Sequence, residues 1–308
     1  MGYQIIIKES KYLLYKTYSL LEDSASTLTT YVLQQDPYDH RNVKRPAIIV
    51  CPGGGYQYVS ENEGEPVAMA FTRAGYCAFV LDYSVKIENP FPKGLTELAA
   101  AVKLVRAHAD EWNIDADDIT VAGFSAGGHL ALCLGVFYDK EFVTKPLNAT
   151  PDDIRPNALV LGYPAITLKP WNRAPIDPEI VRMMDEGLMP DLRGADITQI
   201  LSGKMDVSEE EKDYFNLLNH VSDKTPPSFI WGSNQDSIIH PSDLWGLASN
   251  LRENSVPYEL HIFGRGPHGQ GTSDETVLPK AALSSFHLRE WVHLAQLWLE
   301  ENRNERNN

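Results

Sequence analysis

Six short runs of apolar residues recur along this chain. They cover residues 47–53, 76–83, 118–125, 157–164, 228–233 and 258–264. Continuous apolar runs of this length are typical of strands that are buried on both faces, as in a parallel sheet. Two further candidate strands, around residues 3–7 and 28–33, are expected to form an antiparallel edge at the start of the sheet.

Helical periodicity fills the intervals between these runs. Apolar residues spaced by three and four over 95–112 give one apolar face. Residues 126–138 are apolar and follow a strand directly, and a last amphipathic helix is predicted around 283–298. Strands that alternate with helices predict an α/β fold with a mostly parallel central sheet flanked by helices.

One interval lacks a clear strand and is rich in proline, methionine and charge. We expect this insertion, approximately residues 166–225, to form a small helical cap, since long segments inside a compact domain are usually lids. The whole chain, 1–308, then forms a single domain. Its polar end, residues 301–308, is expected to be frayed.

The net charge of the chain argues against some classes of binding partner. The net charge of the 308 residues is −15, and the acidic residues are scattered along the chain. An acidic surface repels phosphate backbones, so we expect no nucleic-acid partner and no binding to anionic membranes. No apolar stretch is long enough to span a bilayer. Whether the chain forms a homo-oligomer, such as a dimer, stays open.

Cysteine usage and the first residues bear on location and cofactors. Cys51, Cys77 and Cys133 have neither paired nor metal-type spacing. The N-terminus lacks the apolar run and cleavage site of a signal peptide, so a reducing, cytoplasmic setting is expected. No cluster of His, Cys, Asp or Glu has the spacing of metal ligands, so we expect no metal and no cofactor.

The main chemical signal is the sequence Gly-Phe-Ser-Ala-Gly around Ser125. It directly follows a strand-like run and directly precedes an apolar helix pattern. A strand–turn–helix setting is what a nucleophile elbow requires, because a tight turn then holds the serine hydroxyl above the sheet. A serine that only caps a buried helix is the alternative.

A second signal is the run Pro-Gly-Gly-Gly-Tyr at residues 52–56, which follows an early strand. Glycines let backbone N–H groups approach a substrate oxygen closely. Gly54 and Gly55, together with Ala126 after the serine, are therefore candidate oxyanion donors, and Tyr56 is a candidate substrate contact. The run lacks the spacing of the phosphate-binding motifs.

An acid and a histidine follow in the order that this elbow requires. Asp236 and His268 each lie just beyond a strand run, at the end of an α/β sheet where ligand sites occur. Asp223 precedes its strand and Asp243 falls in the next helix, so both are weaker candidates. His240 is close to Asp236 and is a further candidate for lining the site.

Taken together, these motifs resemble the α/β-hydrolase superfamily. They are PGGGY at 52–56, the stretch 63–84, GFSAGGHLA at 123–131, the stretch 232–243 and GPHG at 266–269. The closer likeness is to the bacterial acetyl esterase and lipase group, which includes acetyl-xylan-esterase-like and feruloyl-esterase-like hydrolases. Pro52 and Phe124 depart from the hormone-sensitive-lipase-like branch.

The resemblance implies a serine carboxylesterase that hydrolyses short-acyl, acetyl-type esters through Ser125, His268 and Asp236. A small-molecule ester is then the substrate, and carbohydrate esters are one class left open. A lipase or peptidase-like serine hydrolase is an alternative, and so is a non-catalytic ligand-binding protein on a hydrolase scaffold.

Overall fold

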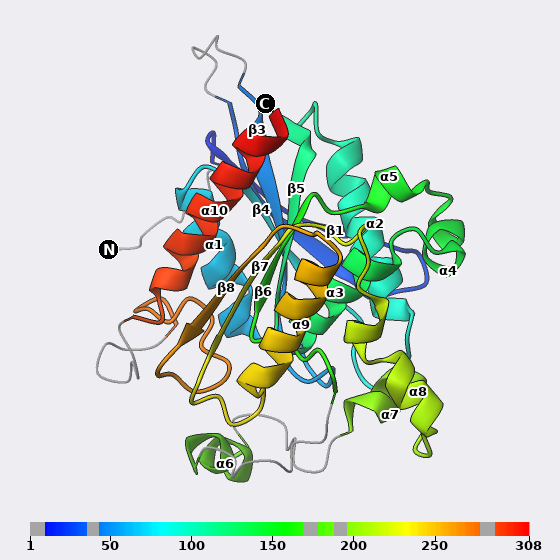
Figure 1. Cartoon of the computed structure of the whole chain (residues 1–308). Coiled ribbons are helices and arrows are strands. Elements are labelled where there is room, and N and C mark those ends of the chain that lie inside the picture. The colour runs from blue at the N-terminus through cyan, green and yellow to red at the C-terminus, as the bar shows by residue number, and fades with distance from the viewer. Residues whose placement is uncertain (1–9, 36–42, 169–177, 188–195, 278–286, 308) are drawn as a thin grey trace, which may run out of the picture.

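The computed structural model of this chain describes residues 10–35, 43–168, 178–187, 196–277 and 287–307. Within these ranges eight strands form one sheet in the order β1-β2-β4-β3-β5-β6-β7-β8 (Figure 1). β1 pairs with β2, and β2 with β4, in antiparallel fashion, while every other neighbouring pair is parallel. The predicted α/β fold with a mostly parallel sheet and an antiparallel edge is confirmed.

The six apolar runs all become strands. The strands are β1 (Leu13–Ser19), β2 (Thr27–Leu33), β3 (Arg45–Cys51), β4 (Cys77–Asp82), β5 (Ile114–Phe124), β6 (Ala158–Gly162), β7 (Ser228–Ser233) and β8 (Tyr258–Phe263). The candidate strand at 3–7 lies outside the described residues. The edge strand β1 was not predicted, because its side chains are only half-buried or exposed and show no apolar run.

Helices connect the strands. The α-helices are α1 (Glu65–Arg73), α2 (Lys93–Ala107), α3 (Ala126–Phe137), α4 (Glu141–Thr144), α5 (Pro151–Ile154), α6 (Pro178–Asp185), α7 (Ile197–Ser202), α8 (Glu209–Tyr214), α9 (Pro241–Glu253) and α10 (Glu290–Asn307). The 3₁₀ turns are η1 (Glu61–Glu63), η2 (Lys145–Leu147) and η3 (Leu217–His220). Among these described helices, none has the length and apolar character needed to cross a bilayer.

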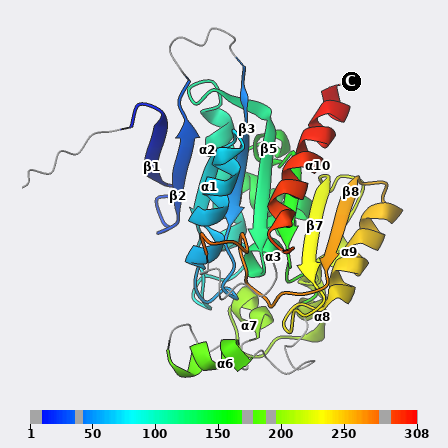
Figure 2. The same cartoon turned by 90° about the vertical axis from the view of Figure 1, so that its left-hand side faces the viewer.

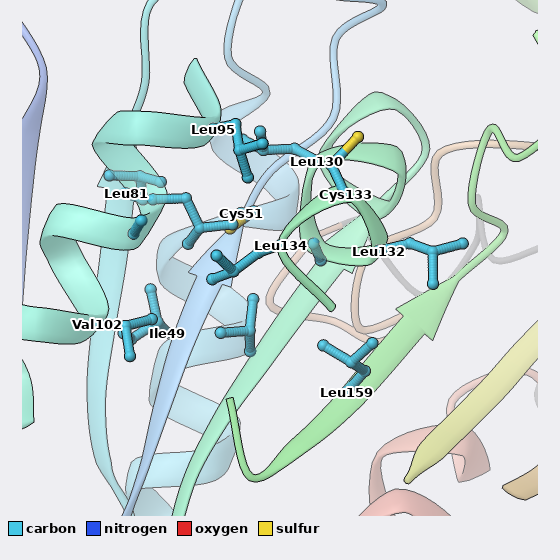
Figure 3. Packing of buried hydrophobic residues seen from close by; sticks show 14 of the residues in the cluster. Ile49, Cys51, Leu81, Leu95, Val102, Leu130, Leu132, Cys133, Leu134 and Leu159 are labelled. Atoms are coloured by element: carbon cyan, nitrogen blue, oxygen red, sulfur yellow. The ribbon is translucent and has the colours of Figure 1, made fainter. Parts of the chain in front are cut away.

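Apolar residues of the central strands alternate between two cores, one on each face of the sheet. In β3, Ile49 and Cys51 join the core under α2, α3 and α9, whereas Ile48 and Val50 join the core under α1 and α10 (Figure 2). Figure 3 shows the first core, where side chains of α2 and α3 meet the strands. The sheet is thus buried on both faces, which explains its continuous apolar runs.

The insertion between β6 and β7 is helical where the structure describes it. α6, α7 and α8 lie beyond the carboxyl ends of β5 and β7, on the side of the sheet where the parallel strands end (Figures 1 and 2). These three helices lie within the insertion predicted for 166–225. That the insertion forms a cap stays a prediction.

The end of the chain departs from the prediction of a frayed tail at 301–308. The last helix, α10, continues to Asn307. Asn302 is buried, and the guanidinium groups of Arg303 and Arg306 both bind the carboxylate of Asp118 in β5. The prediction relied on the polar composition of this segment, which does not indicate that the segment is helical or that ion pairs hold it to the sheet.

Candidate active site

Ser125 occupies a strained turn between β5 and α3. β5 ends at Phe124 and α3 begins at Ala126, so the serine is the single residue between them. Its backbone lies at φ 52° and ψ −118°, a region that costs a non-glycine residue free energy. Strain of this kind is typical of functional sites and holds the hydroxyl away from the helix.

The glycine loop after β3 packs directly against this turn. A Cβ atom on Gly127 would lie 2.1 Å from the carbonyl oxygen of Cys51 and 2.3 Å from that of Pro52. Only glycine permits so close an approach of two backbones. The side chain of Tyr83 fixes the same loop, since its hydroxyl donates to the Pro52 carbonyl at 2.8 Å.

The candidate oxyanion donors lie on the two sides of this contact. Gly54 and Gly55 have φ values of 123° and 62°, which favour glycine, and a Cβ on Gly54 would lie 2.0 Å from the Tyr58 carbonyl oxygen. Ala126 is the first residue of α3. Amides in the first turn of a helix have no acceptor within that helix, which is the property expected of an oxyanion donor.

Three side chains predicted from the sequence meet in one hydrogen-bonded line. The His268 Nε2 atom lies 2.8 Å from the Ser125 hydroxyl oxygen, and Nδ1 lies 2.8 Å from Oδ2 of Asp236. A carboxylate only accepts, so Nδ1 carries the proton and Nε2 accepts from the serine hydroxyl. This is the arrangement in which a histidine removes a proton from a nucleophilic serine.

Both carboxylate oxygens of Asp236 accept hydrogen bonds. Its Oδ1 atom accepts hydrogen bonds from the backbone amides of Ile238 and Ile239, at 2.8 and 2.9 Å. The side chains of His268 and Asp236 are 9% and 2% exposed. A charge-assisted hydrogen bond that is so well shielded from water fixes the orientation of the imidazole ring.

Burial and charge act on His268 in opposite directions. Burial alone lowers the pKa of the imidazole, but the charge of Asp236, its hydrogen bond, and the charge of Glu63 raise it more. The pKa of His268 therefore lies above its ordinary value of 6.5. A raised pKa makes the neutral imidazole a stronger base toward the serine hydroxyl.

The remaining candidates lie elsewhere. Asp243 lies within α9, as predicted, and accepts from the Thr167 hydroxyl. Asp223 is exposed in the turn before β7. The exposed imidazole of His240 caps the start of α9, where it accepts from the Ser242 amide.

Tyr56 was expected to contact substrate, and the structure turns it inward instead. The side chain is 4% exposed, and its hydroxyl lies 2.9 Å from Nδ1 of His129. The ring of Tyr56 also packs edge-on against Tyr83 and His129. Burial lowers the pKa of His129 to about 4, so this imidazole stays neutral and serves packing and hydrogen bonding. Tyr56 therefore links the end of the glycine run to His129 of α3.

Two further residues of the site were not predicted. Glu63 accepts from the Gly53 amide at 2.8 Å and from the Tyr163 hydroxyl at 2.7 Å. Tyr163 packs its ring against that of His268, with centroids 4.8 Å apart. Both residues stand in segments that carry the family resemblance or a strand run, but no spacing in the sequence connects them to the serine.

Comparison with known proteins adds family evidence to this geometry. A family model described as BD-FAE matches residues 36–251. The chain is 36% identical over 233 residues to endo-1,4-beta-xylanase B of Butyrivibrio fibrisolvens, covering 74% of this chain and 33% of that protein. It is 32% identical over 231 residues to the acetylxylan esterase of Xylanibacter ruminicola, covering 73% and 41%. The chain thus spans less than half the length of either relative.

A solved structure agrees with the sequence relatives. The acetyl ester-xyloside bifunctional hydrolase from Caldicellulosiruptor lactoaceticus superposes with a TM-score of 0.68 at 30% identity. The match covers 90% of this chain and 88% of that one. The similarity therefore extends over nearly the whole fold.

Proposed function

This chain belongs to the BD-FAE family of α/β-hydrolases, and we propose that it is a serine carboxylesterase acting on short-acyl esters. The observation that carries the proposal is the hydrogen-bonded line from Ser125 through His268 to Asp236. A strained, glycine-flanked serine in contact with a histidine base is suited to nucleophilic attack on a carbonyl. The same pair argues against a ligand-binding protein that only uses the scaffold.

In the proposed reaction His268 acts first as a base and then as an acid. Its Nε2 atom takes the hydroxyl proton of Ser125 while Oγ bonds to the ester carbonyl carbon. The ester C–O bond then breaks, and Nε2 returns the proton to the departing alcohol. Asp236 stabilises the imidazolium between these two transfers. An acyl-serine remains.

Backbone amides are proposed to hold the negative charge of the tetrahedral intermediate. The amides of Gly54 and Ala126, with Gly55 as a further donor, stand on loops that the structure packs together. Loss of one such donor typically costs about 3–4 kcal/mol of transition-state stabilisation. Water then attacks the acyl-serine with His268 as base, which releases the carboxylic acid and the free serine.

Acetyl groups on carbohydrate are the substrate class that the relatives favour. The acetylxylan esterase and the acetyl ester-xyloside hydrolase both act on acetyl esters by their names. We extend that class to this chain as part of the proposal. The expectation of a cytoplasmic location stays a prediction; the three cysteines are free and buried, as a reducing setting allows.

A chain-length series of nitrophenyl esters, followed by acetylated xylo-oligosaccharides, tests the proposal. We expect turnover to be fastest on acetate and to fall as the acyl chain lengthens. Ser125→Ala should lower kcat by about 10⁶-fold, because the nucleophile is lost while the fold remains. Absence of turnover on every short ester, or full turnover by the variant, contradicts the proposal.

A further inference from the structure

Glu63 is a buried carboxylate that the reaction scheme above does not use. It is the last residue of η1 and is 2% exposed. Burial raises the pKa of Glu63, while its hydrogen bonds and the charge of His268 act against that shift. A carboxylate is costly to bury unless its oxygens are paired, so its partners are informative.

The two oxygens of Glu63 bind two different parts of the site. Oε2 accepts from the amide of Gly53, the residue immediately before the candidate oxyanion donor Gly54. Oε1 accepts from the hydroxyl of Tyr163, which follows β6. The Tyr163 oxygen in turn accepts from the amide of Gly271 at 3.0 Å, on the loop that carries His268.

The chain of contacts therefore joins the oxyanion loop to the histidine loop. Tyr163 is 2% exposed and its ring lies against the His268 ring, at 4.8 Å between centroids and 63° between planes. The far side of the Gly271 loop is fixed as well, because the Trp291 indole donates to the Gly271 carbonyl at 2.9 Å. Every link is shielded from water, where hydrogen bonds are strong and directional.

Resting on the proposed esterase function, we infer that Glu63 is a positioning residue that aligns the oxyanion loop with the triad histidine through Tyr163. Its negative charge also stabilises the imidazolium that forms when His268 takes the serine proton. Among the residues that the structure describes, the groups that face His268 are Ser125, Asp236, Glu63 and Tyr163. Of these, Glu63 alone adds a second negative charge beside Asp236.

Two substitutions separate the effect of the Glu63 charge from the effect of the hydrogen bonds that connect Glu63 through Tyr163 to Gly271. Glu63→Gln keeps the shape of the side chain and removes the charge. Its amide oxygen is able to accept from the Gly53 amide while its amide nitrogen donates to the Tyr163 oxygen, so the contact with Tyr163 remains and the direction of that hydrogen bond is reversed. Tyr163→Phe keeps the ring on His268 and the charge of Glu63 but removes the hydroxyl that connects Glu63 to Gly271.

The chain offers a matched control two residues away. Glu65, the first residue of α1, accepts from the Tyr31 hydroxyl at 2.7 Å, the same kind of pair at the same distance. It is exposed, and its hydrogen bond with Tyr31 involves neither the triad nor the glycine loop. Glu65→Gln and Tyr31→Phe should therefore leave kcat and its pH profile unchanged.

We expect each site variant to lower kcat on a nitrophenyl acetate by on the order of 10- to 100-fold, with KM nearly unchanged, because misaligned groups lose transition-state stabilisation. Glu63→Gln should in addition move the acid limb of the kcat profile to lower pH, since a charge that favours the imidazolium is gone. A purely structural role would not move that limb. Circular dichroism and urea unfolding establish that the variants are folded.

Folded variants with kcat within about twofold of the wild type and an unmoved acid limb overturn the inference. If Glu63→Gln does not fold, Tyr163→Phe decides by kcat alone. The labelling rate of Ser125 by a fluorophosphonate gives an independent measure, since it needs an activated serine but no natural substrate. A wild type that labels but hydrolyses no ester refutes the proposed function, and slower labelling of the variants still supports the role of Glu63.

Discussion

At the scale of single residues, the site depends on how the surroundings of His268 balance burial against charge. Burial disfavours the imidazolium, whereas Asp236 and Glu63 favour it, and the charges prevail. The folded-state pKa of His268 is therefore above 6.5. Its stabilising contribution to the fold is fully present at low pH and is lost as pH rises through that raised pKa.

The expected pH dependence of the activity is opposite to that of the stability. The proposed reaction needs a neutral imidazole, so kcat/KM should fall as pH drops through the raised pKa of His268, with a midpoint above 6.5. Steady-state rates on a nitrophenyl acetate between pH 5 and 9 measure this limb. A rate that stays flat over that range is incompatible with His268 as the base.

Asp236 supplies the second prediction at this scale. Asp236→Asn should lower kcat by about 10⁴-fold, because an amide at this position no longer fixes the tautomer in which Nε2 accepts. The acid limb should also move to lower pH, since the main favourable charge is lost. Asp243→Asn, in the neighbouring helix α9, is the matched control and should retain activity. Equal losses in both variants would discount a specific role for Asp236.

At the scale of elements, the turn between β5 and α3 is defined by how closely it approaches the loop after β3. A single residue, Ser125, separates the end of the strand from the start of the helix, and Gly127 lies in contact with the Cys51 and Pro52 carbonyls. The residues of β5 from Asp118 to Phe124 and all residues of α3 are buried, which leaves little room for the turn between them to move. The strain at Ser125 is therefore maintained by packing on both sides of the turn.

Gly127→Ala tests this contact. The added methyl group would meet backbone oxygens rather than a flexible side chain, so we expect a loss of about 3 kcal/mol or more in the free energy of unfolding. Gly264→Ala, where no atom lies within 4 Å of the added carbon, should change it by about 0.5 kcal/mol at most. Urea unfolding of both variants gives the comparison. A small effect at Gly127 means that the β3 loop is free to shift.

Local patterns were enough to predict much of this arrangement. The buried strands, the elbow at Ser125 and the order of Asp236 and His268 are encoded in short segments whose spacing has a direct physical meaning. β1 escaped prediction because an edge strand needs no continuous apolar run. Glu63 and Tyr163 lie 100 residues apart and meet only in the folded chain. The inward turn of Tyr56 likewise depends on His129, on a different element.

At the scale of the whole molecule, α10 connects the site to the opposite end of the sheet. Near its start, Trp291 is fully buried and donates to the Gly271 carbonyl on the histidine loop. Near its end, Arg303 and Arg306 bind Asp118, close to the start of β5. A helix of 18 residues spans about 27 Å, so one element fixes both the site loop and the far edge of the core.

Truncation of the chain after Glu301 tests whether this connection contributes to stability. The deletion removes the buried Asn302 and both partners of Asp118, whose side chain is only 6% exposed and would be left without its cations. Because the arginines are partly exposed, solvent screening moderates the loss, and we expect about 2 kcal/mol in the free energy of unfolding. Asp118→Asn in the full chain should reproduce part of that loss, and deletion of Asn308 alone, which removes none of these contacts, should reproduce none. If the chain ending at Glu301 unfolds like the full chain in urea, residues 302–308 contribute nothing to stability, as a frayed tail would.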